Sequence, residues 1–569
     1  MCAVDDDDSS DDDQNSSFCS DLLPNDNVLR RGPDDSHILS KTYENNHTVQ
    51  LQGSVLRMRQ ELVSQPVQLK IVEDAQPTGQ TTTTTAHIAW NGEIYQMLDG
   101  TKANEDLSLE DLWHYDDSDT SLVCQRIQQA LQEGANSKED PITSISRQLE
   151  RLVNAEYAIV MVTVGAIYVA RDPWGRRSLL KYEEEDEEPK KCGASSFQLC
   201  SVLPSSLMLE QRSNDREFWT ELPPGILFEY SFRTRTWRHQ SFQSSRSTLI
   251  QSPSLLPSLA DKYLPSPILR EGVDPAIWEA SLYLEQYLRQ AVAMRMDHSG
   301  DRSTGVLFSG GIDSVVLAAL AIEQQHEQSI STPVVLSNVS FGPDYEKSAD
   351  RKAALESYRQ LKELYPEKSI QYEDIVVSWE DIVAIEPHIR TLLFPKETIM
   401  DINIATALWF ACRGSLENGQ DATSPRVLLL GMGADEQMGG YGRHRKAFEQ
   451  NGVEALKKEL VMDQERLWDR NLGRDDRIAA DHGKEARFPY LDVHVTKLLR
   501  ELPSESICDF TLPPGVGDKR ILRLVAGRLG LDHASGLVKR AIQFGSRISH
   551  LSDTKRFGSR RKAKGEATV

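Results

Sequence analysis

Residues 305–321 read GVLFSGGIDSVVLAALA, and this stretch decides the fold of the C-terminal half of the chain. GVLF predicts a short strand, Ser-Gly-Gly a tight loop, and the following run rich in Ala, Leu and Val a helix that begins at once. Two glycines let backbone N–H groups approach an anion closely, and the helix N-terminus adds partial positive charge. The loop is therefore interpreted as a pyrophosphate cradle.

The polar residues of the loop support this interpretation. Ser309 and Ser314 offer hydroxyl donors beside Gly310 and Gly311. Asp313 would repel a bare phosphate, so we expect it to hold a magnesium ion that the phosphate also binds. The GxxxxGK[ST] pattern of kinase and GTPase phosphate loops does not occur in the sequence, which argues against γ-phosphoryl transfer.

The residues around the loop alternate helices and strands. A helix is expected from Pro275, with Asp274 as its N-cap and an apolar face formed by Ile277, Ala280, Leu284, Leu288 and Ala291. PVVLSNVSF (333–341) and RVLLLGMG (426–433) are typical of buried strands. This alternation predicts an α/β domain with a parallel sheet covered by helices.

The N-terminal half has a different pattern. Short apolar runs rich in β-branched and aromatic residues, at 158–170, 197–203 and 225–232, predict a strand-rich α+β domain. We expect an acidic, disordered leader over 1–20, this domain over 21–240, a Ser/Pro-rich linker over 241–270, the α/β domain over 271–552 and a basic tail over 553–569.

Composition narrows the class of protein. The formal net charge of −22 disfavours nucleic acid as a partner. No apolar run is long enough to span a bilayer, and the start is unlike a secretory signal, so we expect a cytoplasmic protein. Seven scattered cysteines predict reduced thiols, mostly packed in cores, rather than a disulfide framework.

Two further segments carry a resemblance to a known family. LLLGMGADEQMGGYGRHR (428–445) and RDDRIAADHGKEARFPYLD (474–492), with SGGIDS, resemble three motifs of glutamine-hydrolysing asparagine synthetases in the family's order. The resemblance implies an ATP pyrophosphatase domain that uses ATP and magnesium. It implies that Gly433 approaches the adenylate, that Asp435 is catalytic, and that Glu436 and Arg487 bind aspartate. For Arg474 and Asp475 a structural salt-bridge network is the preferred interpretation.

The N-terminal half is similar to class II glutamine amidotransferases. The segments that carry this similarity are RRGPDDSH (30–37), SQPV (64–67), WNGEIY (90–95), DDSDTSLV (116–123), RDPWGRRSLL (171–180) and ELPPGILF (221–228). The similarity implies a four-layer αββα sandwich in which Cys2 is the nucleophile and its own α-amino group the base. Asn91 and Gly92 then form the oxyanion hole, and Arg57, Asn91, Glu93 and Asp119 bind glutamine.

The chain departs from the family at four places. Met432 stands where metabolic asparagine synthetases carry a glutamate, and Ala541 aligns with a lysine that supports adenylation there. Lys539 and Arg540 are the candidates to replace that lysine, but each lies at a different spacing. A glutamine-binding arginine of the family aligns with Leu56, which leaves the neighbouring Arg57 and Arg59 as candidates for its role. Aspartates follow Val4, so we expect the first strand to stop at Val4 and Cys2 to lie on a loose tail. Cys19 has more hydrophobic neighbours in the sequence than Cys2 has.

The expected function is the synthesis of asparagine from aspartate, ATP and glutamine through a β-aspartyl-AMP intermediate, with small molecules as partners. One alternative is a catalytically degenerate homologue that acts as a binding or scaffold protein. Another is the adenylation and amidation of a different carboxylate.

Overall fold

The computed structural model describes fourteen stretches of the chain: residues 2–6, 26–31, 34–42, 47–55, 63–73, 82–97, 118–183, 197–203, 218–242, 274–299, 301–327, 331–396, 398–415 and 424–551. Leu56, Arg57, Cys19, most of the linker and the basic tail lie outside these residues. Contacts divide the chain into two compact units. Unit 1 is Met1–Thr248 with Thr391–Pro395 and Trp468–Gly483, and unit 2 is Leu249–Arg390, Lys396–Leu467 and Lys484–Val569. The contiguous boundaries expected from the sequence did not anticipate the two later segments of unit 1.

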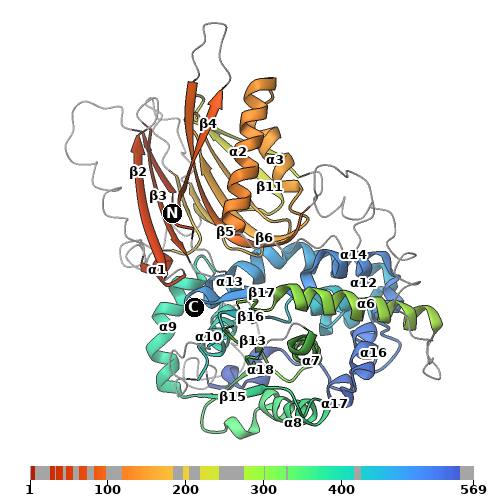
Figure 1. Ribbon diagram of the computed structural model, residues 1–569. Coiled ribbons are helices and arrows are strands. Elements are labelled where there is room, and N and C mark those ends of the chain that lie inside the picture. The colour runs from red at the N-terminus through yellow and green to blue at the C-terminus, as the bar shows by residue number, and fades with distance from the viewer. Residues whose placement is uncertain are drawn as a thin grey trace. The chain divides into compact units, whose positions relative to one another are not determined.

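The described part of unit 1 contains two antiparallel sheets, each of six strands (Figure 1). The first has the order β10-β8-β9-β1-β3-β2, with strands Trp219–Glu221, Leu180–Glu183, Phe197–Cys200, Cys2–Asp6, His47–Val55 and Asp35–Thr42. The second has the order β12-β11-β7-β6-β5-β4, with strands Thr236–Ser241, Ile226–Ser231, Ala166–Arg171, Asn154–Val162, Thr82–Gln96 and Val67–Glu73.

Helices and apolar side chains complete the sandwich of unit 1. The helices α2 (Asp119–Ser137) and α3 (Pro141–Glu150) share a core with the second sheet through residues such as Ile127 and Ile145 (Figure 1). A separate core joins strands of both sheets, and it contains Val49, Leu51, Val162, Val169, Phe197 and Leu199. The short helix α1 (Asp26–Arg31) contacts β3. The predicted α+β sandwich is confirmed.

The expectation for the first strand is wrong. Strand β1 does not stop at Val4 but continues to Asp6, and its first residue, Cys2, pairs with Leu51 on one side and Leu199 on the other. Pairing with β9 ends at Val4, whereas pairing with β3 continues to Asp6. Among the described residues the pairing on the β9 side thus ends at Val4, and edge positions of a sheet tolerate charged residues. The backbone of Cys2 lies in the middle of a sheet rather than on a loose tail.

The described part of unit 2 is built on a five-stranded sheet with the order β15-β14-β13-β16-β17, and all its pairings are parallel. The strands are Ile370–Val377, Val334–Phe341, Thr304–Leu307, Val427–Leu429 and Glu485–Arg487. Every residue of β14 is buried, as a strand covered on both faces requires. This confirms the predicted α/β domain.

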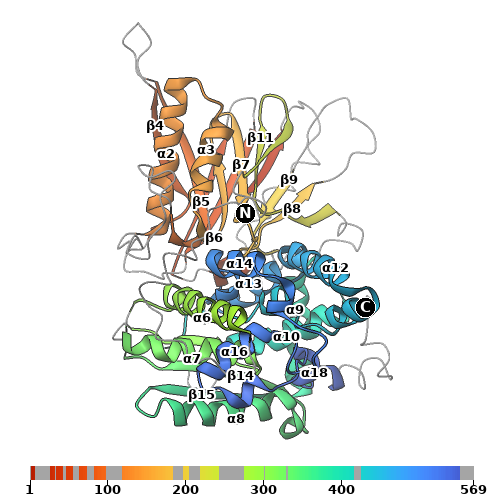
Figure 2. The ribbon, with the colours of Figure 1, turned by 90° about the vertical axis from the view of Figure 1, so that its right-hand side faces the viewer.

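Helices surround this sheet, and Figure 2 shows α6, α7 and α16 packed together. The helices of unit 2 are α6 (Pro275–Arg295), α7 (Ile312–Glu327), α8 (Ala349–Leu364), α9 (Trp379–Leu393, which ends in unit 1), α10 (Ile399–Arg413), α11 (Ala434–Met438), α12 (Gly442–Leu467), α14 (Val493–Glu501), α15 (Ser504–Ile507), α16 (Arg520–Arg528), α17 (Asp532–Ser535) and α18 (Ile542–Gly545), with short 3₁₀ turns at Tyr345–Lys347 and Pro489–Leu491. Asp274 caps α6 by accepting a hydrogen bond from Ala276 N, as predicted. None of the helices in the described ranges has both the length and the apolarity that crossing a membrane requires.

The strand order places a ligand site. Strand β14 lies on one side of β13 and β16 on the other, so the order reverses at β13. Ligands of open α/β sheets bind beyond the carboxyl ends of the strands at such a point. The SGGIDS loop follows β13, and the GADE segment follows β16.

Candidate functional site

The loop after β13 is held in one conformation by its own serines and by α8. Ser309 Oγ accepts from Gly311 N at 3.3 Å, and Ser314 Oγ donates to Gly311 O at 3.0 Å. Gly310 has a φ of +73°, and a Cβ there would lie 2.2 Å from Ala354 N. Only glycine fits at position 310, because the conformation is left-handed and α8 leaves no room for a side chain.

Four charged side chains form an alternating chain beside this loop. Lys519 Nζ lies 2.7 and 2.6 Å from the two carboxylate oxygens of Asp313 and 2.6 Å from Asp435 Oδ1. Lys539 Nζ lies 2.5 Å from Asp435 Oδ2. Burial by itself raises the pKa of Asp435, but the charges of Lys519 and Lys539 outweigh it and hold this pKa below its usual range. Asp435 is therefore ionised at neutral pH.

The backbone is shaped to admit Lys519. This residue has a φ of +52°, an uncommon conformation for a residue with a side chain, and its N–H donates to Met438 O at 2.9 Å. A Cβ at Gly440 would lie 1.9 Å from Asp435 Oδ1 and 2.5 Å from Lys519 Cε. The second glycine of MGGYG therefore makes room for the Asp435–Lys519 pair.

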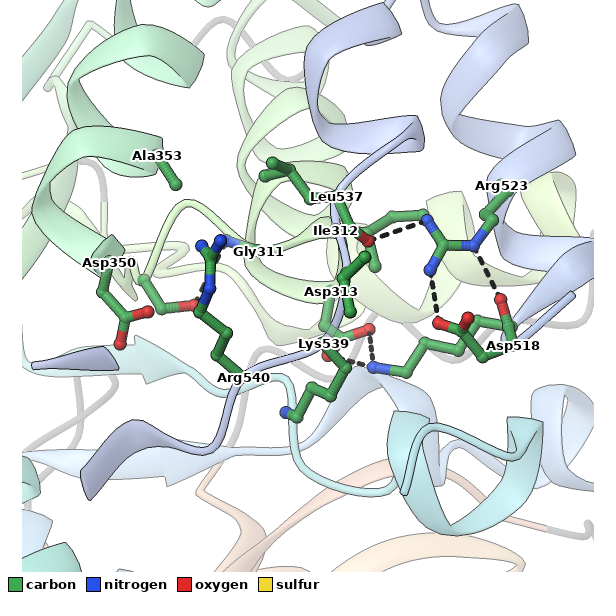
Figure 3. Close-up of a pocket in the computed structure, with 13 residues that line it drawn as sticks. Gly311, Ile312, Asp313, Asp350, Ala353, Asp518, Arg523, Leu537, Lys539 and Arg540 are labelled. Atoms are coloured by element: carbon green, nitrogen blue, oxygen red, sulfur yellow. Dashed lines mark hydrogen bonds and ion pairs between the residues drawn. The ribbon is translucent and has the colours of Figure 1, made fainter. Parts of the chain in front are cut away.

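Asp313, Lys519 and Lys539 line one pocket in unit 2, and Asp435 pairs with both of these lysines (Figure 3). Its lining comprises Ser309, Gly311, Ile312, Asp313, Asp350, Ala353, Asp518, Lys519, Arg523, Leu537, Val538, Lys539 and Arg540. Arg523 pairs with Asp518 and donates to Ser535 O, so its guanidinium is engaged within the protein. Burial raises the pKa of Asp350 to about 7, against the charges of Lys539 and Arg540. A cradle of loop N–H groups and cations is suited to phosphate oxygens.

Of the four residues of this domain assigned by resemblance, Asp435 reaches the pocket only through its lysine partners, and Gly433, Glu436 and Arg487 are not in the lining either. Gly433 has a φ of +93°, and a Cβ there would lie 2.4 Å from Leu491, so local packing explains the glycine. Glu436 accepts hydrogen bonds from Gly433 N and from the hydroxyl of Tyr441. Arg487 pairs with Glu485 at 2.7 Å and donates to the carbonyls of Arg295 and Met296.

Glu436 is an unusual carboxyl group. It is buried next to the ionised Asp435, and burial together with this neighbouring charge raises the pKa of Glu436 to about 7. The phenol of Tyr441 donates to it. The group thus titrates close to neutral pH within hydrogen-bonding distance of the N-terminus of α11.

In unit 1, three of the amidotransferase-like segments meet. Gln65 Oε1 accepts from Trp90 N at 2.6 Å, and Gln65 Nε2 donates to Thr120 Oγ1 at 3.3 Å. Asp119, the first residue of α2, accepts from Ile94 N at 3.1 Å. The segments SQPV, WNGEIY and DTSLV are therefore bound to one another, which brings Asp119 near the strand that carries Asn91, Gly92 and Glu93.

Two features of this strand bear on the oxyanion-hole assignment. Asn91 Nδ2 is buried, and it donates to no acceptor among the described residues. A Cβ at Gly92 would lie 2.3 Å from Glu156 O, so only glycine fits against β6. Glu93 is buried as well. An amide donor with no acceptor among the described residues is the kind of group that an oxyanion hole requires.

A buried ion network joins other segments of unit 1. Asp476 Oδ2 accepts from Arg31 Nη2 at 2.6 Å and from Ser178 N at 3.0 Å, and Asp476 Oδ1 from Arg177 Nη1 at 3.3 Å. Glu221 pairs with Arg477 and, at 3.0 Å, with Arg171. Asp476 and Arg477 belong to α13 (Gly473–Ala480), which follows the π-helical turn Trp468–Leu472. The structural interpretation preferred for Arg474 and Asp475 agrees with the direct pairing of those two residues at 2.8 Å.

Comparison with known proteins decides the family. The yeast "Asparagine synthetase domain-containing protein YML096W" (Saccharomyces cerevisiae) is 30% identical over 557 residues, which cover 92% of this chain and 88% of that protein. The chain belongs to the asparagine synthetase domain-containing proteins. The family description "Asparagine synthase" matches residues 283–532.

Relatives in animals agree with this placement. "Asparagine synthetase domain-containing protein 1" of Bos taurus is 29% identical over 642 residues, which cover 92% of each chain. The protein of the same name in Mus musculus is 39% identical over 296 residues, which cover 44% of this chain and 47% of that protein. In the alignment with the Mus musculus protein, the chain thus spans about half the length of that relative. The family is one of asparagine synthetase-like proteins, which use ATP in general.

For this asparagine synthetase domain-containing protein, sequence reasoning missed part of the site. It did not name Lys519, Asp518, Arg523 or Asp350, and it gave Lys539 only as one of two candidates, at a different spacing, to replace the lysine missing at Ala541. The one local signal was the run GDKRILR (517–523), in which a lysine directly precedes a helix. Its approach to Asp313, 206 residues earlier, is a property of the tertiary fold.

Proposed function

We propose that this protein is a ligase that makes asparagine from aspartate, ATP and glutamine through a β-aspartyl-AMP intermediate. The observation that carries the proposal is the pocket of unit 2, which the SGGIDS loop, Lys519 and Lys539 line beyond the carboxyl ends of adjacent parallel strands. Asp435 pairs with both lysines. Family membership supports a ligase of this class.

The proposed chemistry has two steps in unit 2. A carboxylate oxygen of aspartate attacks the α-phosphorus of ATP, the bond to the β-phosphate breaks, and pyrophosphate leaves with the electron pair. Ammonia then attacks the acyl carbon, loses a proton, and displaces AMP. The loop N–H groups and the cations of the pocket stabilise the charge on the leaving pyrophosphate.

Magnesium fits this scheme through Asp313. Mg²⁺ is usually bound by one or two carboxylates together with substrate phosphates, and Asp313 supplies a carboxylate directly after the loop. When bound, the ion would neutralise phosphate charge. Both oxygens of Asp313 contact Lys519 Nζ, so the carboxylate must be shared with the ion or released by this lysine.

Unit 1 is proposed to release ammonia from glutamine. Cys2 is the proposed nucleophile, and the pairing of its backbone inside a sheet supplies the fixed position that a nucleophile needs. Asn91 and the Gly92 backbone are the proposed oxyanion hole, supported by the unused amide donor of Asn91. Asp119 and Glu93 are proposed to bind glutamine together with Arg57, and a cytoplasmic location remains part of the proposal.

A second candidate is the adenylation and amidation of another carboxylic acid. It is favoured by the internal hydrogen bonds of Glu436 and Arg487, the two residues assigned to aspartate. Met432 in place of a glutamate also points to a changed acceptor.

Exchange of pyrophosphate into ATP tests both candidates. Aspartate-dependent exchange that disappears in Asp313→Ala supports asparagine synthesis, and exchange with a different acid supports the second candidate. Absence of exchange with any acid in a folded protein would sink both and favour the degenerate scaffold. Ammonia release from glutamine is measured separately, with Cys2→Ala compared with Cys19→Ala; only the first should abolish it.

A further inference from the structure

We propose that Lys539 is the lysine that binds the nucleotide phosphates in the pocket of unit 2, that Asp435 positions it, and that Lys519 is an enclosed link between Asp313 and Asp435. This assignment rests on the proposed use of ATP at this site. It gives the two lysines of one ion-pair chain different tasks.

Exposure separates the two lysines. The side chain of Lys519 is only 1% exposed, and its ammonium already contacts carboxylate oxygens of both Asp313 and Asp435. The side chain of Lys539 is 31% exposed, its ammonium pairs with Asp435, and the residue lines the pocket with Ser309, Gly311 and Asp313. An ammonium has three donors. Lys539 can therefore keep its bond to Asp435 and still donate to a ligand, whereas Lys519 is already shared between two carboxylates.

The charges of the site agree with this division. Burial alone would lower the pKa of Lys539, but Asp435 and Asp313 raise it above its usual value, so the ammonium stays charged. Two carboxylates and two lysines balance one another before a ligand enters. A polyphosphate adds negative charge. Beyond Lys519, the pocket lining offers the cations of Lys539 and its neighbour Arg540 (Figure 3).

The segment that carries Lys539 is anchored close by. Helix α18 begins at Ile542, three residues after Lys539. Ser348 Oγ donates a hydrogen bond to Gly545 O at 2.8 Å. A Cβ at Gly545 would lie 2.0 Å from Asp350 Oδ1, so α18 packs directly on the first turn of α8. Phe341 N, at the end of β14, donates to Ser546 O at 3.1 Å. These contacts hold in place the segment that follows Lys539. Ala541, the position that aligns with the family's lysine, is the N-cap of α18.

The test is the equilibrium binding of Mg-ATP, AMP and pyrophosphate to full-length protein, measured by calorimetry for the wild type, Lys539→Met, Lys539→Arg and Lys519→Met. Loss of a charge-assisted hydrogen bond predicts about 10- to 100-fold weaker binding of ATP and pyrophosphate to Lys539→Met. AMP binding should weaken less, and Lys539→Arg should recover part of the loss. Lys457→Met, at an exposed lysine of α12 paired with Glu454, is the matched control.

Thermal unfolding separates binding from structure. Lys519→Met should lower the melting temperature more than Lys539→Met, because its removal leaves both Asp313 and Asp435 without the enclosed cation. Unchanged ATP binding in folded Lys539→Met would overturn the assignment, and so would an equal loss of AMP and ATP binding together with an equal fall in melting temperature. Wild-type protein that binds ATP but exchanges no pyrophosphate would refute the proposed function alone, since the binding assay still decides the role of Lys539. Wild-type protein that binds neither ATP nor pyrophosphate would refute both.

Discussion

Substitution of Asp476 by alanine should destabilise unit 1, although Asp476 lies in the C-terminal half of the sequence. Its carboxylate is 3% exposed and accepts from Arg31, Arg177 and the backbone of Ser178. The side chains of Arg31 and Arg177 are 9% and 1% exposed. The substitution leaves two guanidinium groups and one N–H of a buried site without this acceptor.

The magnitude follows from the environment. Removing one partner of a buried ion pair costs about 3–5 kcal/mol. Arg177 keeps Glu156 at 3.6 Å, so the lower end of the range applies. One kcal/mol lowers the melting temperature of a domain of 150–250 residues by about 2–4 °C, which predicts a fall of roughly 6–12 °C for Asp476→Ala.

Differential scanning calorimetry of the full-length protein at pH 7 is the assay. If the two units unfold in separate transitions, only the transition of unit 1 should shift. Glu133→Ala, at an exposed position of α2 in the same unit, is the control and should change stability by no more than about 0.5 kcal/mol. An Asp476→Ala protein that melts at the wild-type temperature would refute the claim that α13 is an integral part of unit 1.

Three further predictions concern Asp476, Glu436 and Asn91. Burial raises the pKa of Asp476, but Arg31 and Arg177 outweigh it and hold this pKa below its usual range. The stabilisation by Asp476 is therefore present above the unfolded pKa of about 3.9 and is lost as the pH falls through the lower folded value. Urea titrations should show that the difference in unfolding free energy between wild type and Asp476→Ala shrinks below about pH 4. The pKa of Glu436 is raised to about 7 from 4.5, so the folded state binds one more proton between these pH values. The free energy of unfolding should therefore fall as the pH rises through this range. Glu436→Gln should flatten the pH dependence in the same titrations, and an unchanged slope would contradict the raised pKa. Asn91→Ala should lower the kcat of glutamine hydrolysis by about 100- to 1000-fold with little change in KM, and a change confined to KM would contradict the oxyanion-hole role.

Local signals in the sequence determined much of this protein. The cap and apolar face of α6, the turn from β13 into α7, and the alternation of buried strands with helices depend on residues close together in the chain, so they could be predicted from it. The resemblance to asparagine synthetases assigned Asp313 and Asp435 to the same domain, and the structure shows that the two strands before them, β13 and β16, are adjacent.

The prediction for the start of the chain was wrong because it used the cost of burying carboxylates without knowing how the strands pair. Four aspartates after Val4 predicted that the strand would end there, because burying an unpaired carboxylate is costly. In the structure β1 nevertheless continues to Asp6 through its pairing with β3, whereas in the described residues its pairing with β9 ends at Val4. Which strand ends first is a property of the sheet and leaves no local signal.

Tertiary structure alone decided which distant charges meet. Arg31 and Asp476 are 445 residues apart, Arg177 and Asp476 are 299 apart, and Asp313 and Lys519 are 206 apart. Of these residues, only Asp313 stands in a motif that indicates its role, and the others look like ordinary surface charges in the sequence. Apolar periodicity specifies the face that an element buries, but the low dielectric of an interior makes a charge dependent on whichever partner the fold brings to it. The sequence therefore determined the elements and the phosphate loop, and the fold decided that α13 belongs to unit 1 and that Lys519 and Lys539 complete the pocket.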